Sequence, residues 1–315
     1  MNAEASEAKC RPHWASGFFV VLRLLVVIFA WQLFGQDPSR EGWVMWMIVV
    51  AAGVLLPLAR PLQKLRGESS LESQQWLMVQ TLFLGLLPKP GYESAILVCA
   101  WFVWCGIVAF ESLWKLLKGS LRDAGSLCVA VAGIFPLIGA AWLVAHRANW
   151  TPWNFDPLIV MLTAAHFHHA GFTLPLMAGL NAKASPGCWT RFSCVAILVG
   201  VPLVAAGITC THFGVLRFVE PFGVTVLVLG ALGVAVSQIR RGMSKKGGWL
   251  ERAGFVVSGI SLLSAMVLAM GFGLRHVMPN WALTMPQMWM IHGTLNAFGF
   301  GLCGILAWRS KMSAI

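Results

Sequence analysis

The chain has 315 residues, of which 58% are hydrophobic and only 11% charged, and its mean hydropathy is +0.74. A soluble fold cannot bury so much apolar surface, whereas apolar segments of about 17 to 25 residues match the hydrocarbon core of a bilayer. Such segments use almost the whole length, which excludes a separate soluble catalytic domain. The formal net charge of +11 indicates a basic face against anionic lipid and needs no nucleic acid to explain it.

Ten apolar segments predict an all-α, polytopic transmembrane helical bundle. In chain order they cover residues 14–34, 43–58, 74–88, 93–114, 124–145, 157–180, 192–212, 217–239, 253–274 and 286–308. The third segment is short, and the count becomes nine if it lies in the interface or re-enters the membrane. No linker or repeat divides the chain, so residues 1–315 are predicted to form one integral membrane domain.

Lysine and arginine residues test this count independently, because they accumulate in cytoplasmic loops. With ten spans, seventeen of them fall on the side of the two chain ends and five on the opposite side. An even number of spans with cytoplasmic N- and C-termini follows. We therefore expect a multi-pass protein whose main partner is the lipid bilayer.

Three histidines, His166, His168 and His169, lie in the middle of the sixth segment. An ionisable side chain at bilayer depth loses hydration, so it usually faces a bundle interior or a wet cavity and marks a functional site. On a helix, His166 and His169 share one face, whereas His168 points about 160° away from His166. One helix therefore cannot aim all three at a single point, and other segments must complete the site.

The tenth segment supplies the best further candidates, His292 and Asn296, which are four residues apart and share a helix face. Counted from the outer helix ends, His166 and Asn296 lie about 15 Å deep and His292 about 9 Å deep. Two acidic residues at the same outer side, Glu220 and Asp156, are also candidates for handling a substrate or protons. Asp156 in addition suits a helix N-cap, because a proline follows it.

These residues leave three functions open. The polar groups could bind a small molecule or lipid and exchange protons with it, as in a transporter. Neutral imidazoles also bind transition metals, so His166, His169 and His292 could hold zinc, copper or iron, or a pair of them could clamp a haem in a membrane enzyme. In a structural or assembly role, the histidines would instead hydrogen-bond across helices and stabilise packing.

The run from Asn154 to Phe172, together with the run from Ile291 to Phe300, resembles the YndJ-like family of bacterial multispanning membrane proteins. The resemblance is strongest over about residues 150–310, and it implies an inner-membrane location. It also implies that the His-x-His and His-Gly-x-x-Asn stretches form one site, and that His166 and His168 are the more important central histidines. The positions on the helix instead pair His166 with His169. No biochemical activity is established for the family, although a transporter role is sometimes attached to it.

Overall fold

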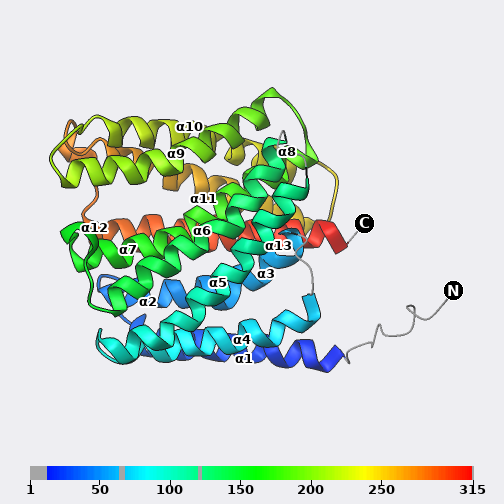
Figure 1. Cartoon of the computed structure of the whole chain (residues 1–315). Helices are drawn as coiled ribbons and strands as arrows, with labels where there is room; N and C mark the ends of the chain where they lie inside the picture. Colours follow the sequence, from blue (N-terminus) through cyan, green and yellow to red (C-terminus); the bar gives the residue numbers. More distant parts are fainter. Residues whose placement is uncertain (1–12, 64–67, 120–122, 314–315) are drawn as a thin grey trace.

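A computed structural model describes residues 13–63, 68–119 and 123–313, which form a bundle of helices (Figure 1). In chain order the helices are α1 (His13–Phe34), α2 (Glu41–Val50), α3 (Leu56–Gln63), α4 (Glu68–Leu86), α5 (Tyr92–Lys118), α6 (Ala124–Arg147), α7 (Pro157–His168), α8 (Ala170–Ala184), α9 (Cys188–His212), α10 (Val219–Met243), α11 (Trp249–Gly273), α12 (Met285–Gln287) and α13 (Cys303–Ser313). π-Helical turns join α2 to α3 and α12 to α13; they span Ala51–Leu55, Met288–Gly293 and Leu295–Leu302. No strand occurs in these described ranges.

Each of the ten predicted segments coincides with one helix or with one run of consecutive helices. Among the residues that the structure describes, seven runs are long and apolar enough to cross a membrane: Glu41–Gln63, Tyr92–Lys118, Ala124–Arg147, Cys188–His212, Val219–Met243, Trp249–Gly273 and Met285–Lys311. The third predicted segment corresponds to α4, which packs against α1 and α5. The predicted all-α polytopic bundle is therefore confirmed.

The sixth predicted segment is not one continuous helix. Its backbone turns at His169, where φ is −105° and ψ is −85°, so that α7 ends one residue before this turn and α8 begins one residue after it. The two pieces contain 12 and 15 residues, and each is shorter than a span of about 20 residues. Helices broken at membrane depth are tolerated where the backbone is buried in protein or lines a cavity.

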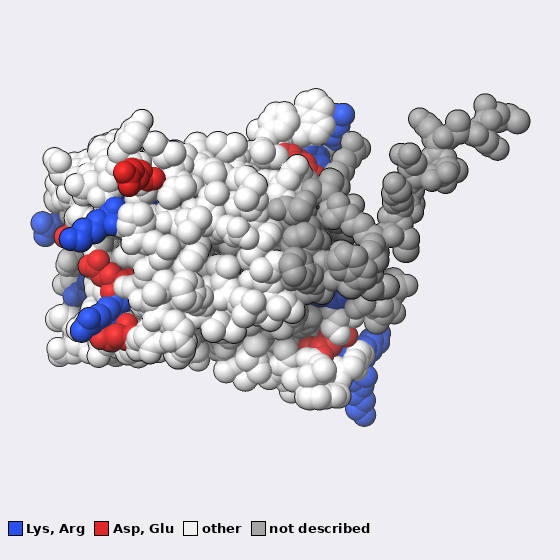
Figure 2. Space-filling model, turned by 90° about the horizontal axis from the view of Figure 1, so that it is seen from below, with Lys and Arg blue, Asp and Glu red and all other residues white. Residues whose placement is uncertain are grey.

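Charged side chains gather at the two ends of the bundle, and a broad uncharged belt separates them on the face shown in Figure 2. This distribution is the one that a lipid bilayer imposes, because charge within the hydrocarbon core is costly. α1 begins and α13 ends at the same end of the bundle (Figure 1), as an even number of spans requires. That this end is cytoplasmic remains a prediction from the loop charges.

The helices that position the site are mostly neighbours in sequence. α9, α10 and α11 pack as consecutive hairpins, while α7 packs against α6 and α2. The last helix, which runs from α12 to α13, packs against α11 and also contacts α8. These contacts bring the sixth and tenth predicted segments, distant in sequence, to the same part of the bundle.

Candidate functional site

The turn at His169 divides the three central histidines between two surroundings. His166 and His169 line a cavity between α2, α7, α10, α11 and the last helix. His168 instead contacts α5 through Trp101 and α6 at Gly139. The structure therefore joins His169 to His166, as the helical-face argument predicted, and not His168, which the family resemblance favoured.

His168 is fully buried, and both of its ring nitrogens are used. The indole N–H of Trp101 donates to Nε2 (2.9 Å), so the imidazole proton lies on Nδ1, which donates to the backbone oxygen of Ala164 (2.8 Å). Gly139 allows this fit, because a Cβ at that position would lie 2.6 Å from Nδ1 of His168. His168 thus fixes α7 against α5 and α6 and has no ring nitrogen left for a ligand.

His169 leaves one ring nitrogen unused. Its Nε2 donates to the backbone oxygen of Met47 on α2 (2.7 Å), while its buried Nδ1 has no hydrogen-bond partner in the described part of the chain. In a neutral imidazole with one donating nitrogen, the other nitrogen is an acceptor. His169 therefore lines the cavity and keeps a buried hydrogen-bond acceptor without a partner among the described residues.

His292 and Asn296 on the last helix line the same cavity. Nδ1 of His292 donates to the backbone oxygen of Ala265 on α11 (2.9 Å), and the Asn296 amide donates to Nε2 of His292 (3.1 Å) and to its backbone oxygen (2.9 Å). Both residues belong to π-helical turns, which are rare and frequent at functional sites. They form a fixed pair whose orientation is set before any ligand arrives.

We call this space the inner cavity; it has a volume of about 240 Å³ and a chiefly apolar wall. Methionine and tryptophan side chains supply much of that wall: Trp43, Met47, Met266, Met285, Met288 and Trp289. Its polar residues are His166, His169, His292, Asn296 and Glu220. All five polar residues are sequence-predicted candidates, and the structure gathers them around one space.

A larger outer cavity of about 830 Å³ adjoins the inner one. Its wall comes from α6, α7 and α9, from the connection between α6 and α7, and from Arg275 after α11. These elements extend to the end of the bundle opposite the two chain ends (Figure 1). Both cavities include His166 and Glu220 in their walls, so these side chains lie at the boundary between the two spaces.

His166 lies at the junction with an exposed side chain, although it is inside the bundle. It makes no hydrogen bond to any residue in the described part of the chain. His166 therefore offers both ring nitrogens, one donor and one acceptor when neutral, to a molecule in the cavities.

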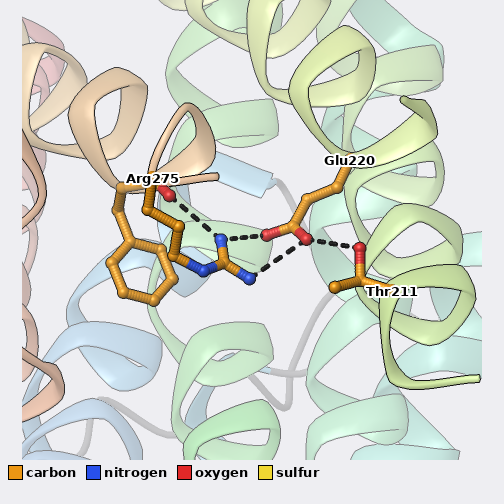
Figure 3. Close-up of polar contacts among 4 residues, drawn as sticks. Thr211, Glu220 and Arg275 are labelled. Atoms are coloured by element: carbon orange, nitrogen blue, oxygen red, sulfur yellow. Dashed lines mark hydrogen bonds and ion pairs between the residues drawn. The ribbon is translucent and has the colours of Figure 1, made fainter. Parts of the chain in front are cut away.

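Glu220 is the buried carboxylate of the site, with only 2% of its surface exposed. The Arg275 guanidinium binds both carboxylate oxygens, and the Thr211 hydroxyl donates to one of them (2.7 Å; Figure 3). Arg275 also donates to the backbone oxygen of Phe272 (3.0 Å). The charge of Glu220 is therefore neutralised, and the side chain links α9, α10 and the end of α11 at the cavity junction.

Arg275 and Thr211 were not among the site residues predicted from the sequence. The available signal was an arginine at the same predicted membrane side as Glu220, since opposite charges at one depth tend to pair. Thr211 carried no signal, because its contact depends on how α9 packs against α10.

Asp156 caps α7, as the sequence predicted, and also lines the outer cavity. One of its carboxylate oxygens accepts a hydrogen bond from the backbone N–H of Leu158 (2.8 Å), and Pro157 is the first helical residue. The capping role is thus confirmed, and it orients the carboxylate at the outer end of the cavity.

His166, His169 and His292 were predicted from the sequence as possible metal ligands. In the described part of the chain, no group of three His, Cys, Asp or Glu side chains could hold a metal ion. One ring nitrogen of His169 and one of His292 are already bound to backbone oxygens of neighbouring helices. A metal or haem site therefore stays a prediction from sequence, while the geometry suits hydrogen bonding to a ligand.

Comparison with known families gives a match to a model described as YndJ-like protein over residues 44–300. The chain belongs to the YndJ-like family. A protein of Bacillus subtilis (strain 168) with the name "Uncharacterized membrane protein YndJ" is 28% identical over 215 residues, which are 66% of this chain and 37% of that relative. The chain thus spans well under half the length of this relative. No solved structure matches the chain.

The match to the YndJ-like family begins at α2 and ends within the last helix, so it includes every polar residue of the inner cavity. It is wider than the stretch on which the sequence resemblance was strongest. Together with the apolar helices, it establishes a multispanning membrane protein of this family that lies in a lipid bilayer.

Proposed function

We propose that this YndJ-like protein binds a small amphipathic molecule, a lipid or lipid-like compound, in the two adjoining cavities and carries it within the bacterial inner membrane. The wall composition supports this ligand class. Ligand sites are usually apolar pockets with a few convergent polar groups, and methionine-rich walls adapt to flexible apolar chains. The inner cavity combines both features.

The observation that carries the proposal is the position of His166. Its imidazole faces open space where the cavities meet, while His168 and His292 have both ring nitrogens engaged. Helix packing does not explain this side chain, because His166 makes no hydrogen bond to another helix in the described part of the chain. A hydroxyl, ester or amine group of a bound amphiphile supplies the missing partner.

The helix break beside this residue supports movement of the ligand. His169, at the break between α7 and α8, is held by one hydrogen bond to α2, and the opposite wall is built from π-helical turns. Broken helices around a midplane site are the elements that rearrange in many transporters. The same residues that bind the ligand are thus attached to the elements that could shift.

Replacing His166 with phenylalanine tests the proposal, because it keeps a ring but removes both nitrogens. We expect the purified variant to retain about five- to tenfold less co-purifying amphiphile per protein than the wild type, as for the loss of one hydrogen bond of about 1 to 1.4 kcal/mol. Solvent extraction followed by mass spectrometry measures the bound molecule. Thermal unfolding in detergent checks that the variant is folded.

His276→Phe is the matched control, because His276 is exposed at the outer end and lies in neither cavity. It should retain as much amphiphile as the wild type. The proposal fails if the wild type retains no amphiphile, or if His166→Phe and His276→Phe retain the same amount.

A further inference from the structure

The outer cavity has an aromatic wall near its open end. Trp142, Trp153 and Phe155 form a triangle of rings with centroids 6.0 to 6.3 Å apart, and all three line the cavity. The ring of His212 packs on Phe155 with centroids 4.2 Å apart. These rings come from α6, α9 and the connection between α6 and α7, so they surround the space from different elements.

Trp153 is held in place by the backbone around it. Its φ of 53° lies in the left-handed region, which is uncommon for a residue other than glycine, and Asn154 beside it has a φ of 60°. Nε2 of His212 donates to the backbone oxygen of Trp153 (3.1 Å). The indole nevertheless remains 62% exposed. The connection therefore fixes a large aromatic face without covering it.

The charges of this cavity leave one carboxylate uncompensated. Arg275 and Glu220 neutralise each other. Asp156 uses one oxygen for the N-cap bond, and its other oxygen has no hydrogen bond in the described part of the chain. Asp156 directly follows Phe155, so the free carboxylate oxygen belongs to the aromatic end of the cavity.

We propose that this aromatic end of the outer cavity binds an ammonium group, the cationic headgroup of the amphiphile. Aromatic faces, tryptophan above all, attract ammonium ions, and a nearby carboxylate adds a charge partner. At this aromatic end an anionic group would meet the carboxylate of Asp156, and Arg275 is already paired with Glu220. The wall therefore selects a cation.

This inference rests on the proposed function and specifies its ligand. Asp156 and His166 are ten residues apart on α7, a distance of about 15 Å along the helix. An extended amphiphile can place its ammonium group beside Asp156 and direct its body toward His166, with the apolar chain in the inner cavity. Phosphatidylethanolamine has this order of groups and serves as the probe.

The test uses the full chain in nanodiscs that contain equal amounts of phosphatidylethanolamine and phosphatidylglycerol with identical acyl chains. Both lipids carry a phosphate, and only the first carries an ammonium group. After extraction into mild detergent, native mass spectrometry counts the lipids that remain bound. We expect the wild type to retain phosphatidylethanolamine over phosphatidylglycerol by about fivefold.

Asp156→Asn should reduce this ratio to near one, because asparagine keeps the N-cap but removes the charge. Trp153→Leu, at an exposed position, should reduce it in the same way. Asp123→Asn is the matched control, since Asp123 caps α6 through the backbone N–H groups of Gly125 and Ser126 and lines neither cavity. It should keep the wild-type ratio.

Equal retention of the two lipids by the wild type would overturn the ammonium site, as would an unchanged ratio in both Asp156→Asn and Trp153→Leu. The proposed function would survive that result if His166→Phe still lowers total retention of both lipids. If free ethanolamine at millimolar concentration displaces the bound lipid, the ammonium site stands and a soluble amine is a second source of the ligand.

Discussion

The Glu220→Gln variant is expected to unfold with a free energy about 3 kcal/mol lower than that of the wild type. Removing one partner of a buried ion pair costs about 3 to 5 kcal/mol, because the other charge is left uncompensated. The low end of this range applies because the Arg275 side chain remains 25% exposed. Chemical unfolding in detergent micelles, followed by circular dichroism, measures the difference.

Two further variants show whether the loss of stability comes from breaking the ion pair or from replacing a carboxylate in general. Glu220→Gln combined with Arg275→Gln should recover much of the loss, since neither charge is then stranded. Asp37→Asn removes a carboxylate that pairs with Arg40 in the exposed turn before α2, and it should leave stability nearly unchanged. A Glu220→Gln variant as stable as Asp37→Asn would contradict the structural role of the pair.

The Gly207→Ala variant is expected to lose about 2 kcal/mol of stability, although alanine is normally the better helix former. Gly207 on α9 faces the backbone of α10 at Glu220, and a Cβ there would lie 2.6 Å from the Glu220 nitrogen. Backbone atoms cannot change rotamer as a side chain can, so α9 and α10 must move apart to make room for the Cβ. This separation also disturbs the placement of Glu220 at the cavity junction.

Gly106→Ala on α5 is the control for this substitution. The nearest atom to a Cβ at Gly106 is Cδ1 of Leu137 at 3.8 Å, an ordinary contact, so this variant should gain about 0.5 to 1 kcal/mol. Opposite signs for Gly207→Ala and Gly106→Ala in the same unfolding assay support the close α9–α10 contact. A gain in both would show that α9 and α10 are not packed this closely.

The positions of the helical segments were predictable, because each of them is a separate stretch of high hydropathy in the sequence. All ten segments correspond to helices, since each must satisfy its own backbone hydrogen bonds in lipid. Gly171 and Pro175 indicate a broken or non-ideal helix in the sixth segment, but the sequence did not place the turn at His169 itself. The hydrogen bond of the His169 side chain to the backbone of α2 joins residues 122 positions apart and has no local signal in the sequence.

The polar residues that line the inner cavity were all candidates from the sequence, but the way in which they come together was not predictable. Helical periodicity separated His168 from His166 and His169, because direction on one helix follows from spacing alone. Depth along the helix also placed Asn296 level with His166 and His292 about one helical turn away. That α7 and the last helix share a cavity, and that Arg275 neutralises Glu220, depends on helix packing, which hydropathy does not encode.

The central claim is that an amphiphile enters the inner cavity, and photocrosslinking tests it most directly. The probe is a phosphatidylethanolamine with a diazirine on its acyl chain, and peptide mass spectrometry locates the crosslinks after irradiation in nanodiscs. We expect labelling of Met47, Met266 or Met288 in the cavity wall, reduced by His166→Phe. Crosslinks found only on outward-facing residues such as Phe110 and Val267, with these methionines unlabelled, would contradict the account.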